Sequence, residues 1–268
     1  MATMPGDRSP IEKGSDESMT GLLKAMAEGL ASPVERRLFA EYGGLFVTMA
    51  LPPPTIIFAD AIEVEAFQAR LPVSRARIGD YEISLQSEAM DALIRAASEM
   101  NDREGQITAR AQDSGGRSYE DTLNLWNRNV TRGLEHWRTE GRITPERAEQ
   151  IRQLAPSAQI SLVLEMEDRE QIYFGTFFDK SILYSVAAPG ASQHLSLLAF
   201  DVAEYQDTEV ERVLAKHGWF RTVPNDLPHF TYLGHSEDRL PELGLILSQR
   251  QYNHRSYGFW VPDLERLR

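Results

Sequence analysis

The chain has 268 residues, of which 42% are hydrophobic and 25% charged, as in soluble globular proteins with one large domain or two small ones. Its net charge of -12 argues against a general nucleic-acid binder, because phosphate binding needs a basic face, and the lack of cysteine excludes disulfides, thiol catalysis and cysteine-ligated zinc. No apolar run approaches the roughly 20 residues that span a bilayer.

The N-terminal part is predicted to be a tail followed by an extension that ends near residue 80. Residues 1–18 are polar and predict a disordered tail. They lack the apolar core of a signal peptide, which leaves open a cytoplasmic protein or one whose signal has been removed. From Met19 to Tyr42 apolar residues recur at helical spacing, and Ser32-Pro33 should restart the helix. The next elements are expected to be strands at Leu45–Leu51 and Thr55–Phe58 and a helix at Glu63–Leu71.

Residues 81–233 mix helices and strands without a regular repeat. Helices are expected at Gln86–Met100, Asp121–Val130 and Thr208–His217, the last ended by Gly218. Strands are expected at Ile107–Ala111, Trp219–Val223 and His229–Leu233.

A polar segment from Leu134 to Phe178 is predicted to be an insertion into this part. It contains a helix start at Thr144-Pro145, and Gln159–Met166 and Gln171–Phe178 are expected to form a hairpin. Residues 234–268 should cover part of the core. The sequence therefore predicts one α+β domain over 19–268, with a small, mainly antiparallel sheet flanked by helices and an inserted helix/hairpin region.

Two short stretches hold the candidate site. His194 and Asp201 lie seven positions apart, between a Pro-Gly turn and an apolar run, and His229 follows Asp226 by three positions. Two imidazoles and one carboxylate are the ligands of a catalytic zinc site that keeps one position open for water, and Asp226 would then be free to act as a base. A single histidine in an apolar stretch is more often a hydrogen-bonded core residue, so spacing alone leaves both interpretations open.

Three segments carry a resemblance to a known family. Ser192, His194, Ala199 and Asp201 fall in the register of the pattern S-x-H-x-x-G-x-A-x-D. Residues 114–121 (SGGRSYED) resemble S-G-Y-R-S-Y-x-x-Q, and residues 217–220 (HGWF) with 226–230 (DLPHF) resemble G-W … E-x-W-H-F. In this order, the patterns are similar to those of the D-alanyl-D-alanine carboxypeptidase and dipeptidase family. These are zinc peptidases related to the vancomycin-resistance enzymes, in a superfamily that includes lysostaphin-type enzymes and the hedgehog signalling domain.

The resemblance implies roles for individual residues. His194, Asp201 and His229 would bind Zn²⁺, and Asp226 would be the general base. Arg117 would stabilise the oxyanion or anchor the substrate. Ser192 could orient a ligand or the substrate, although a turn serine is an equal alternative.

The sequence also departs from the family pattern. Leu197 replaces the signature glycine, Asp226 the usual glutamate, Pro228 a tryptophan and Thr122 a glutamine. Asp226 is one methylene shorter than glutamate, so its reach toward a bound water differs from that of the family.

The implied function is a metallopeptidase, a hydrolase that cuts a peptide bond at a D-amino acid in the stem peptides of peptidoglycan. Such a substrate implies a place in the cell envelope, with no nucleic-acid partner. The alternative is a non-catalytic, zinc-containing cell-wall binding module of the same fold, and a third possibility is a structural protein without metal. Carboxypeptidase, dipeptidase and endopeptidase activity all remain open, as does the oligomeric state.

Overall fold

The structure, a computed structural model, describes residues 16–267. Its order of elements is α1 (Asp16–Glu28), α2 (Pro33–Tyr42), η1 (Gly43–Val47), α3 (Ala61–Gln68), β1 (Val73–Ile78), β2 (Tyr81–Gln86), α4 (Ser87–Asn101), α5 (Tyr119–Thr139), α6 (Pro145–Arg152), α7 (Pro156–Glu170), η2 (Ile182–Tyr184), η3 (Gln193–Ser196), β3 (Ala199–Asp201), α8 (Thr208–Lys216), β4 (Trp219–Phe220), β5 (His229–Tyr232), η4 (Glu237–Arg239), β6 (Leu245–Tyr252) and β7 (Arg255–Pro262).

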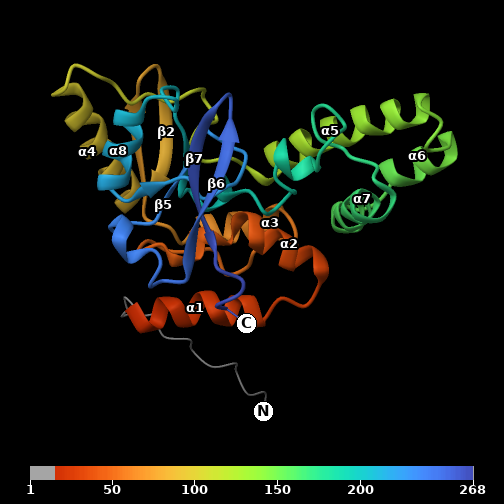
Figure 1. The fold of residues 1–268 in the computed structure, drawn as a ribbon, viewed down its shortest axis with the longest axis horizontal. Coiled ribbons are helices and arrows are strands. Elements are labelled where there is room, and N and C mark those ends of the chain that lie inside the picture. The colour runs from red at the N-terminus through yellow and green to blue at the C-terminus, as the bar shows by residue number, and fades with distance from the viewer. Residues whose placement is uncertain (1–15, 268) are drawn as a thin grey trace, which may run out of the picture.

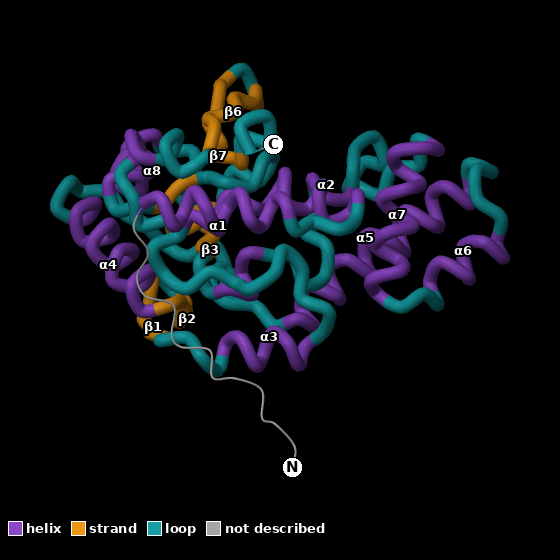
Figure 2. The backbone as a smooth tube through the Cα atoms, turned by 90° about the horizontal axis from the view of Figure 1, so that it is seen from below, coloured by secondary structure: helices purple, strands orange, loops and turns teal. Residues whose placement is uncertain are grey.

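The molecule has two parts (Figure 1). In the mixed part, three small antiparallel sheets lie among helices, with strand orders β1-β2, β3-β5-β4 and β6-β7. The helical lobe, which we define as α5, α6 and α7, projects from one side (Figure 1). Seen from below, α1 runs along the mixed part (Figure 2). This arrangement confirms the predicted α+β class.

Local sequence signals set several element boundaries as predicted. The Ser32 hydroxyl accepts from the Glu35 N–H, and the Glu35 carboxylate accepts from the Ser32 N–H, which starts α2. At the start of α6, the Thr144 hydroxyl accepts from the Arg147 N–H, and Pro145 lies in the first turn. Gly218, at a φ of 81°, follows α8 in the left-handed conformation that glycine adopts readily.

Other predictions were wrong. The hairpin expected in the insertion is absent from the described residues, because Gln159–Met166 lies inside α7 and Gln171–Phe178 forms loop and turn. Leu45–Leu51 begins as the three-ten turn η1, and Thr55–Phe58 makes bends instead of a strand. Ile107–Ala111 contributes one isolated bridge, from Ala109 to Val202.

The N-terminal and C-terminal regions differ in part from the prediction. The predicted tail over 1–18 lies outside the described residues as far as residue 15, and α1 already begins at Asp16. Residues 234–267 form the β6–β7 hairpin and short turns, with Leu240, Phe259 and Trp260 buried. No helix among residues 16–267 is long and apolar enough to cross a membrane.

Candidate metal centre

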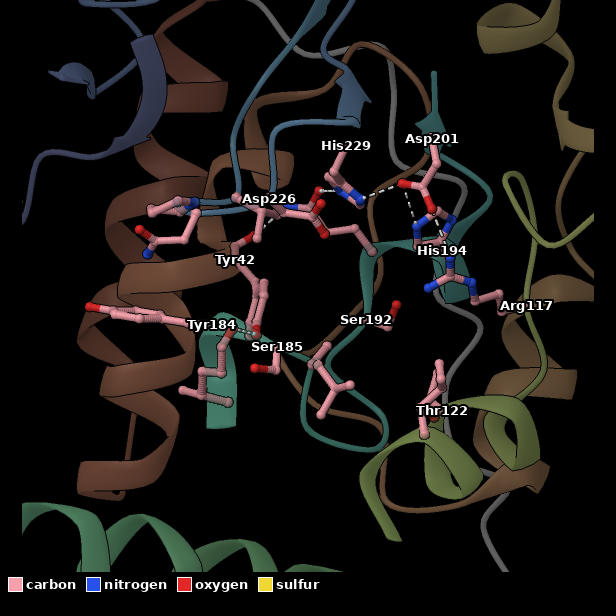
Figure 3. A pocket seen from close by; sticks show the side chains of 18 of the residues that line it. Tyr42, Arg117, Thr122, Tyr184, Ser185, Ser192, His194, Asp201, Asp226 and His229 are labelled. Carbon is pink, nitrogen blue, oxygen red and sulfur yellow. Dashed lines mark hydrogen bonds and ion pairs between the residues drawn. The ribbon is translucent and has the colours of Figure 1, made fainter. Parts of the chain in front are cut away.

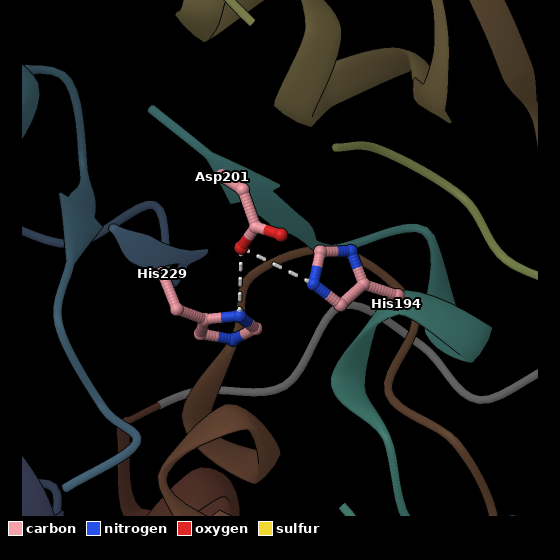
Figure 4. Close-up of side chains that lie close together, drawn as sticks. All are labelled: His194, Asp201 and His229. Atoms are coloured by element: carbon pink, nitrogen blue, oxygen red, sulfur yellow. Dashed lines mark ion pairs between the residues drawn. The ribbon is translucent and has the colours of Figure 1, made fainter. Parts of the chain in front are cut away.

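Antiparallel pairing brings two of the predicted ligands together. Asp201, the last residue of β3, lies directly opposite His229, the first residue of β5. Directly opposite residues project from the same face of a sheet, so the two side chains meet. His194 comes from η3, the turn that leads into β3, and its ring approaches the same carboxylate (Figure 4). The pairing register therefore joins positions that are 28 residues apart in the chain.

The three side chains converge on one point. His194 Nε2 lies 3.4 Å from Asp201 Oδ1, and His229 Nδ1 lies 3.3 Å from the same oxygen (Figure 4). One ligand atom from each residue lies within 4.8 Å of the others. Both imidazoles are buried, at 2% and 4% exposure. This buried group can hold a metal ion.

Hydrogen bonding shows which nitrogen of His194 is free to bind. Its Nδ1 lies 2.6 Å from the backbone carbonyl of Gly115, which can only accept, so Nδ1 carries the proton and Nε2 presents a lone pair. Burial lowers the pKa of His194, which keeps the ring neutral near pH 7. A carbonyl bonded to the far nitrogen is the arrangement that orients metal-binding histidines.

Asp201 is a charged partner for these rings. Its Oδ2 accepts from Arg117 Nη2 at 2.7 Å, whereas its buried Oδ1 accepts no hydrogen bond from the described residues. An acceptor that is buried without a donor is costly, and a cation would remove that cost.

The upstream motif lies against the ligands. The Asp201 N–H donates to the carbonyl of Ser114 at 2.9 Å, and the Arg117 N–H donates to the carbonyl of His194. Together with the Gly115 carbonyl on His194, these contacts join the motif at 114–121 to the motif at 192–201, and the β3–β5 pairing adds the motif that contains His229. The long insertion between them is accommodated by the helical lobe, which leaves the contacts intact.

A cavity of about 300 Å³ opens beside this group (Figure 3). All six residues to which the resemblance assigns a role line it: Arg117, Ser192, His194, Asp201, Asp226 and His229. Asp226 as a whole residue is exposed by surface area, but its carboxyl group is surrounded by protein atoms that remove water from it. This burial raises the pKa of Asp226 despite the opposing effect of His229, and the charge of Asp201 raises it further.

The departures from the family pattern have structural counterparts. Leu197, in place of glycine, adopts the left-handed conformation with a φ of 57° and ends η3. Its side chain is buried with Phe58 and Phe67, so the position keeps a glycine-like backbone and gains an apolar contact. Pro228 is buried, and its carbonyl accepts from the Val202 N–H. Thr122 lines the cavity.

Two further residues matter here that sequence reasoning missed. Gln193 is buried, and its Oε1 lies 2.9 Å from His229 Nε2. Its position directly before His194 was the one available signal. Tyr42 lines the cavity from the end of α2, and the sequence around it gave no sign of this.

A scan against protein-family models and searches of curated proteins and of solved structures found no match to this chain.

Proposed function

We propose that this protein is a zinc-dependent peptidase that hydrolyses a peptide bond at a D-amino acid in peptidoglycan stem peptides, as D-alanyl-D-alanine carboxypeptidases do. One observation carries the proposal: three segments that resemble that family's motifs meet at one cavity, where one ligand atom each of His194, Asp201 and His229 lies within 4.8 Å of the others and the inner oxygen of Asp201 has no hydrogen-bond donor among the described residues. Such a substrate would place its action in the cell envelope.

The donor set fits zinc. Two imidazole nitrogens and one carboxylate oxygen are a common set for catalytic zinc, and the chain has no cysteine that would favour a closed structural site. When bound, zinc would polarise the scissile carbonyl and lower the pKa of a bound water.

The chain's own residues would perform the remaining tasks. Asp226, with its raised pKa, would take a proton from the attacking water onto its carboxylate and deliver it to the leaving amine nitrogen. Arg117 donates Nη2 to Asp201 and Nε to the Asp113 carbonyl, which fixes its guanidinium at the cavity wall. Its other N–H groups would face a developing oxyanion. Ser192 would contact the substrate from the same wall.

The test combines metal content with turnover. Protein purified without chelators should contain about one zinc per chain, and zinc-loaded protein should release D-alanine or split muropeptides. Asp226→Ala should lower kcat by about a hundredfold or more while leaving zinc content unchanged. Asp179→Ala, which removes an exposed carboxylate outside the cavity, is the matched control. Zinc binding without hydrolysis of any D-Ala-D-Ala peptide or muropeptide would favour the non-catalytic binding module instead.

A further inference from the structure

The side chain of Gln193 joins His229 to a buried network. Gln193 Oε1 lies 2.9 Å from His229 Nε2 and also accepts from the Thr231 hydroxyl. Gln193 Nε2 donates to the Tyr42 carbonyl at 2.9 Å and to Thr222 Oγ1 at 3.1 Å. Gln193, Thr222, Thr231 and His229 are all at most 4% exposed. Water therefore cannot replace a missing partner in this network.

The Tyr42 carbonyl fixes the orientation of the Gln193 amide. A backbone carbonyl only accepts, so the amide group that faces it must be the donating Nε2. Turning the amide over would place two carbonyl oxygens 2.9 Å apart in a buried site. Oε1 is consequently the atom that faces His229.

The threonine hydroxyls agree with this orientation. Thr222 Oγ1 accepts from Gln193 Nε2 and can donate to Thr231 Oγ1, which lies 2.7 Å away. Thr231 then donates to Gln193 Oε1. Every proton in this ring has an acceptor, so no second arrangement is needed to satisfy the network.

The network decides the tautomer of His229. Opposite an acceptor at 2.9 Å, Nε2 must carry the proton, which leaves a lone pair on Nδ1. The competing acceptor is Asp201 Oδ1, 3.3 Å from Nδ1, which is beyond the usual range for an N–H···O bond. A proton on Nδ1 would set the bare Nε2 against Gln193 Oε1 at hydrogen-bonding distance.

We propose that Gln193 is a positioning residue that holds His229 in the Nε2–H tautomer and thereby keeps Nδ1 available to a metal ion. The proposal rests on the metal site of the proposed function, although it does not depend on peptide hydrolysis. The ligand it serves is a divalent cation such as zinc, which binds neutral imidazole. Without Gln193, the Asp201 carboxylate becomes the stronger acceptor, and the proton moves to Nδ1.

The first measurement is ¹⁵N NMR of the imidazoles in metal-free full-length protein at about pH 8, above the ordinary histidine pKa of about 6.5. The spectrum of His229→Asn assigns the His229 signals. Wild-type protein should show His229 protonated at Nε2, whereas Gln193→Leu should show it protonated at Nδ1 or exchanging between the two. A wild-type ring protonated at Nδ1 would overturn the proposal, whatever the variants do.

The second measurement is zinc affinity, by competition with a chromogenic chelator. Gln193→Leu should bind zinc about 10- to 100-fold more weakly than wild type, the usual cost of losing a partner that orients a ligand. The matched control is Gln159→Leu, because Gln159 is an equally buried amide whose partners, Trp126 and Ile151, do not line the cavity. Its zinc affinity should stay within about twofold of wild type. Equal losses in both variants would mean that Gln193 acts only through stability and would overturn the proposal.

Thr231→Val covers the case in which Gln193→Leu does not fold. It removes one donor to Gln193 Oε1 and keeps the shape of the side chain, so zinc affinity should fall severalfold while His229 keeps a detectable Nε2–H. Unchanged affinity would contradict the role of the network. A wild-type protein that binds zinc but hydrolyses nothing would overturn the proposed peptidase and support the Gln193 proposal if the tautomer is as expected.

Discussion

Two carboxylates with buried oxygens, Glu167 in the helical lobe and Asp201 in the mixed part, are surrounded in opposite ways. Glu167, where the helical lobe meets α2, accepts from Ser181 Oγ, Arg37 Nη2 and two backbone N–H groups, so both of its oxygens have donors. Asp201, beside the cavity, has a donor on Oδ2 and none on Oδ1 among the described residues. A carboxylate whose two oxygens both have donors stabilises the fold. A carboxylate whose inner oxygen faces only other acceptors can bind a cation.

The largest effect is expected where the saturated carboxylate is removed. Glu167→Ala leaves the Ser181 hydroxyl and the N–H groups of Phe174 and Ile182 without acceptors and Arg37 without its buried partner. Unfolding in urea should show a loss of about 3–5 kcal/mol. Asp168→Ala removes the exposed partner of the same Arg37 and should cost less than about 1 kcal/mol. Similar losses from both variants would show that the buried contacts of Glu167 are not what stabilises this junction.

Asp201→Asn should have the opposite effect, with little change in stability and a large loss of zinc affinity. The amide can keep its oxygen toward Arg117 and donate Nδ2–H toward His194 Nε2 and His229 Nδ1, where no donor stood before. Stability of the metal-free protein should change by no more than about 1 kcal/mol. Zinc affinity should fall by about a hundredfold or more, because a ligand has been lost. A large loss of metal-free stability would mean that Asp201 is a structural carboxylate like Glu167.

The backbone beside the cavity offers a finer comparison. Leu197 has a positive φ and a buried side chain, so its strained backbone and its apolar contacts act against each other. Leu197→Ala should lose about 2–3 kcal/mol of packing, whereas Leu197→Gly loses the same packing but relieves about 1 kcal/mol of backbone strain. Thermal or urea unfolding should therefore find the glycine variant the more stable of the two. The usual order, with alanine better than glycine, would contradict this account.

The smallest effect concerns a carboxylate at the surface. Glu99 on α4 accepts from Lys216, His217 and Arg103, and these hydrogen bonds lower the pKa of Glu99 to about 2. A lowered folded-state pKa means that the stabilisation is present above the ordinary value of 4.5 and is lost as the pH falls toward about 2. Glu99→Gln should therefore be less stable than wild type at pH 7 and equally stable near pH 2. A difference that persists at low pH would show that charge is not the cause.

The sequence predicted the elements whose boundaries depend on local contacts. A serine that caps three residues ahead, a proline in a first turn and a glycine that ends a helix act within a few residues, so Ser32, Thr144 and Gly218 could be interpreted directly. The strand predicted at Gln159–Met166 in the helical lobe was wrong. Over so short a window, its apolar residues fit both the period of a strand and the period of a helix. The buried residues of α7 include Ile160, Val163, Leu164 and Glu167, which follow the helical spacing. Pro156 in the first turn was the overlooked sign of a helix start.

The sequence by itself therefore determined the α+β composition, the helix boundaries marked by Ser32, Thr144 and Gly218, and the residue types able to bind a metal. Only the tertiary structure decided that His229 pairs across a sheet with Asp201, that Gly115 and Gln193 face the far nitrogens of the two imidazoles, and that the inner oxygen of Asp201 lacks a donor. The reason is physical: caps and helical periods depend on neighbours along the chain, whereas a ligand site depends on strand register and on buried hydrogen bonds between residues far apart in sequence.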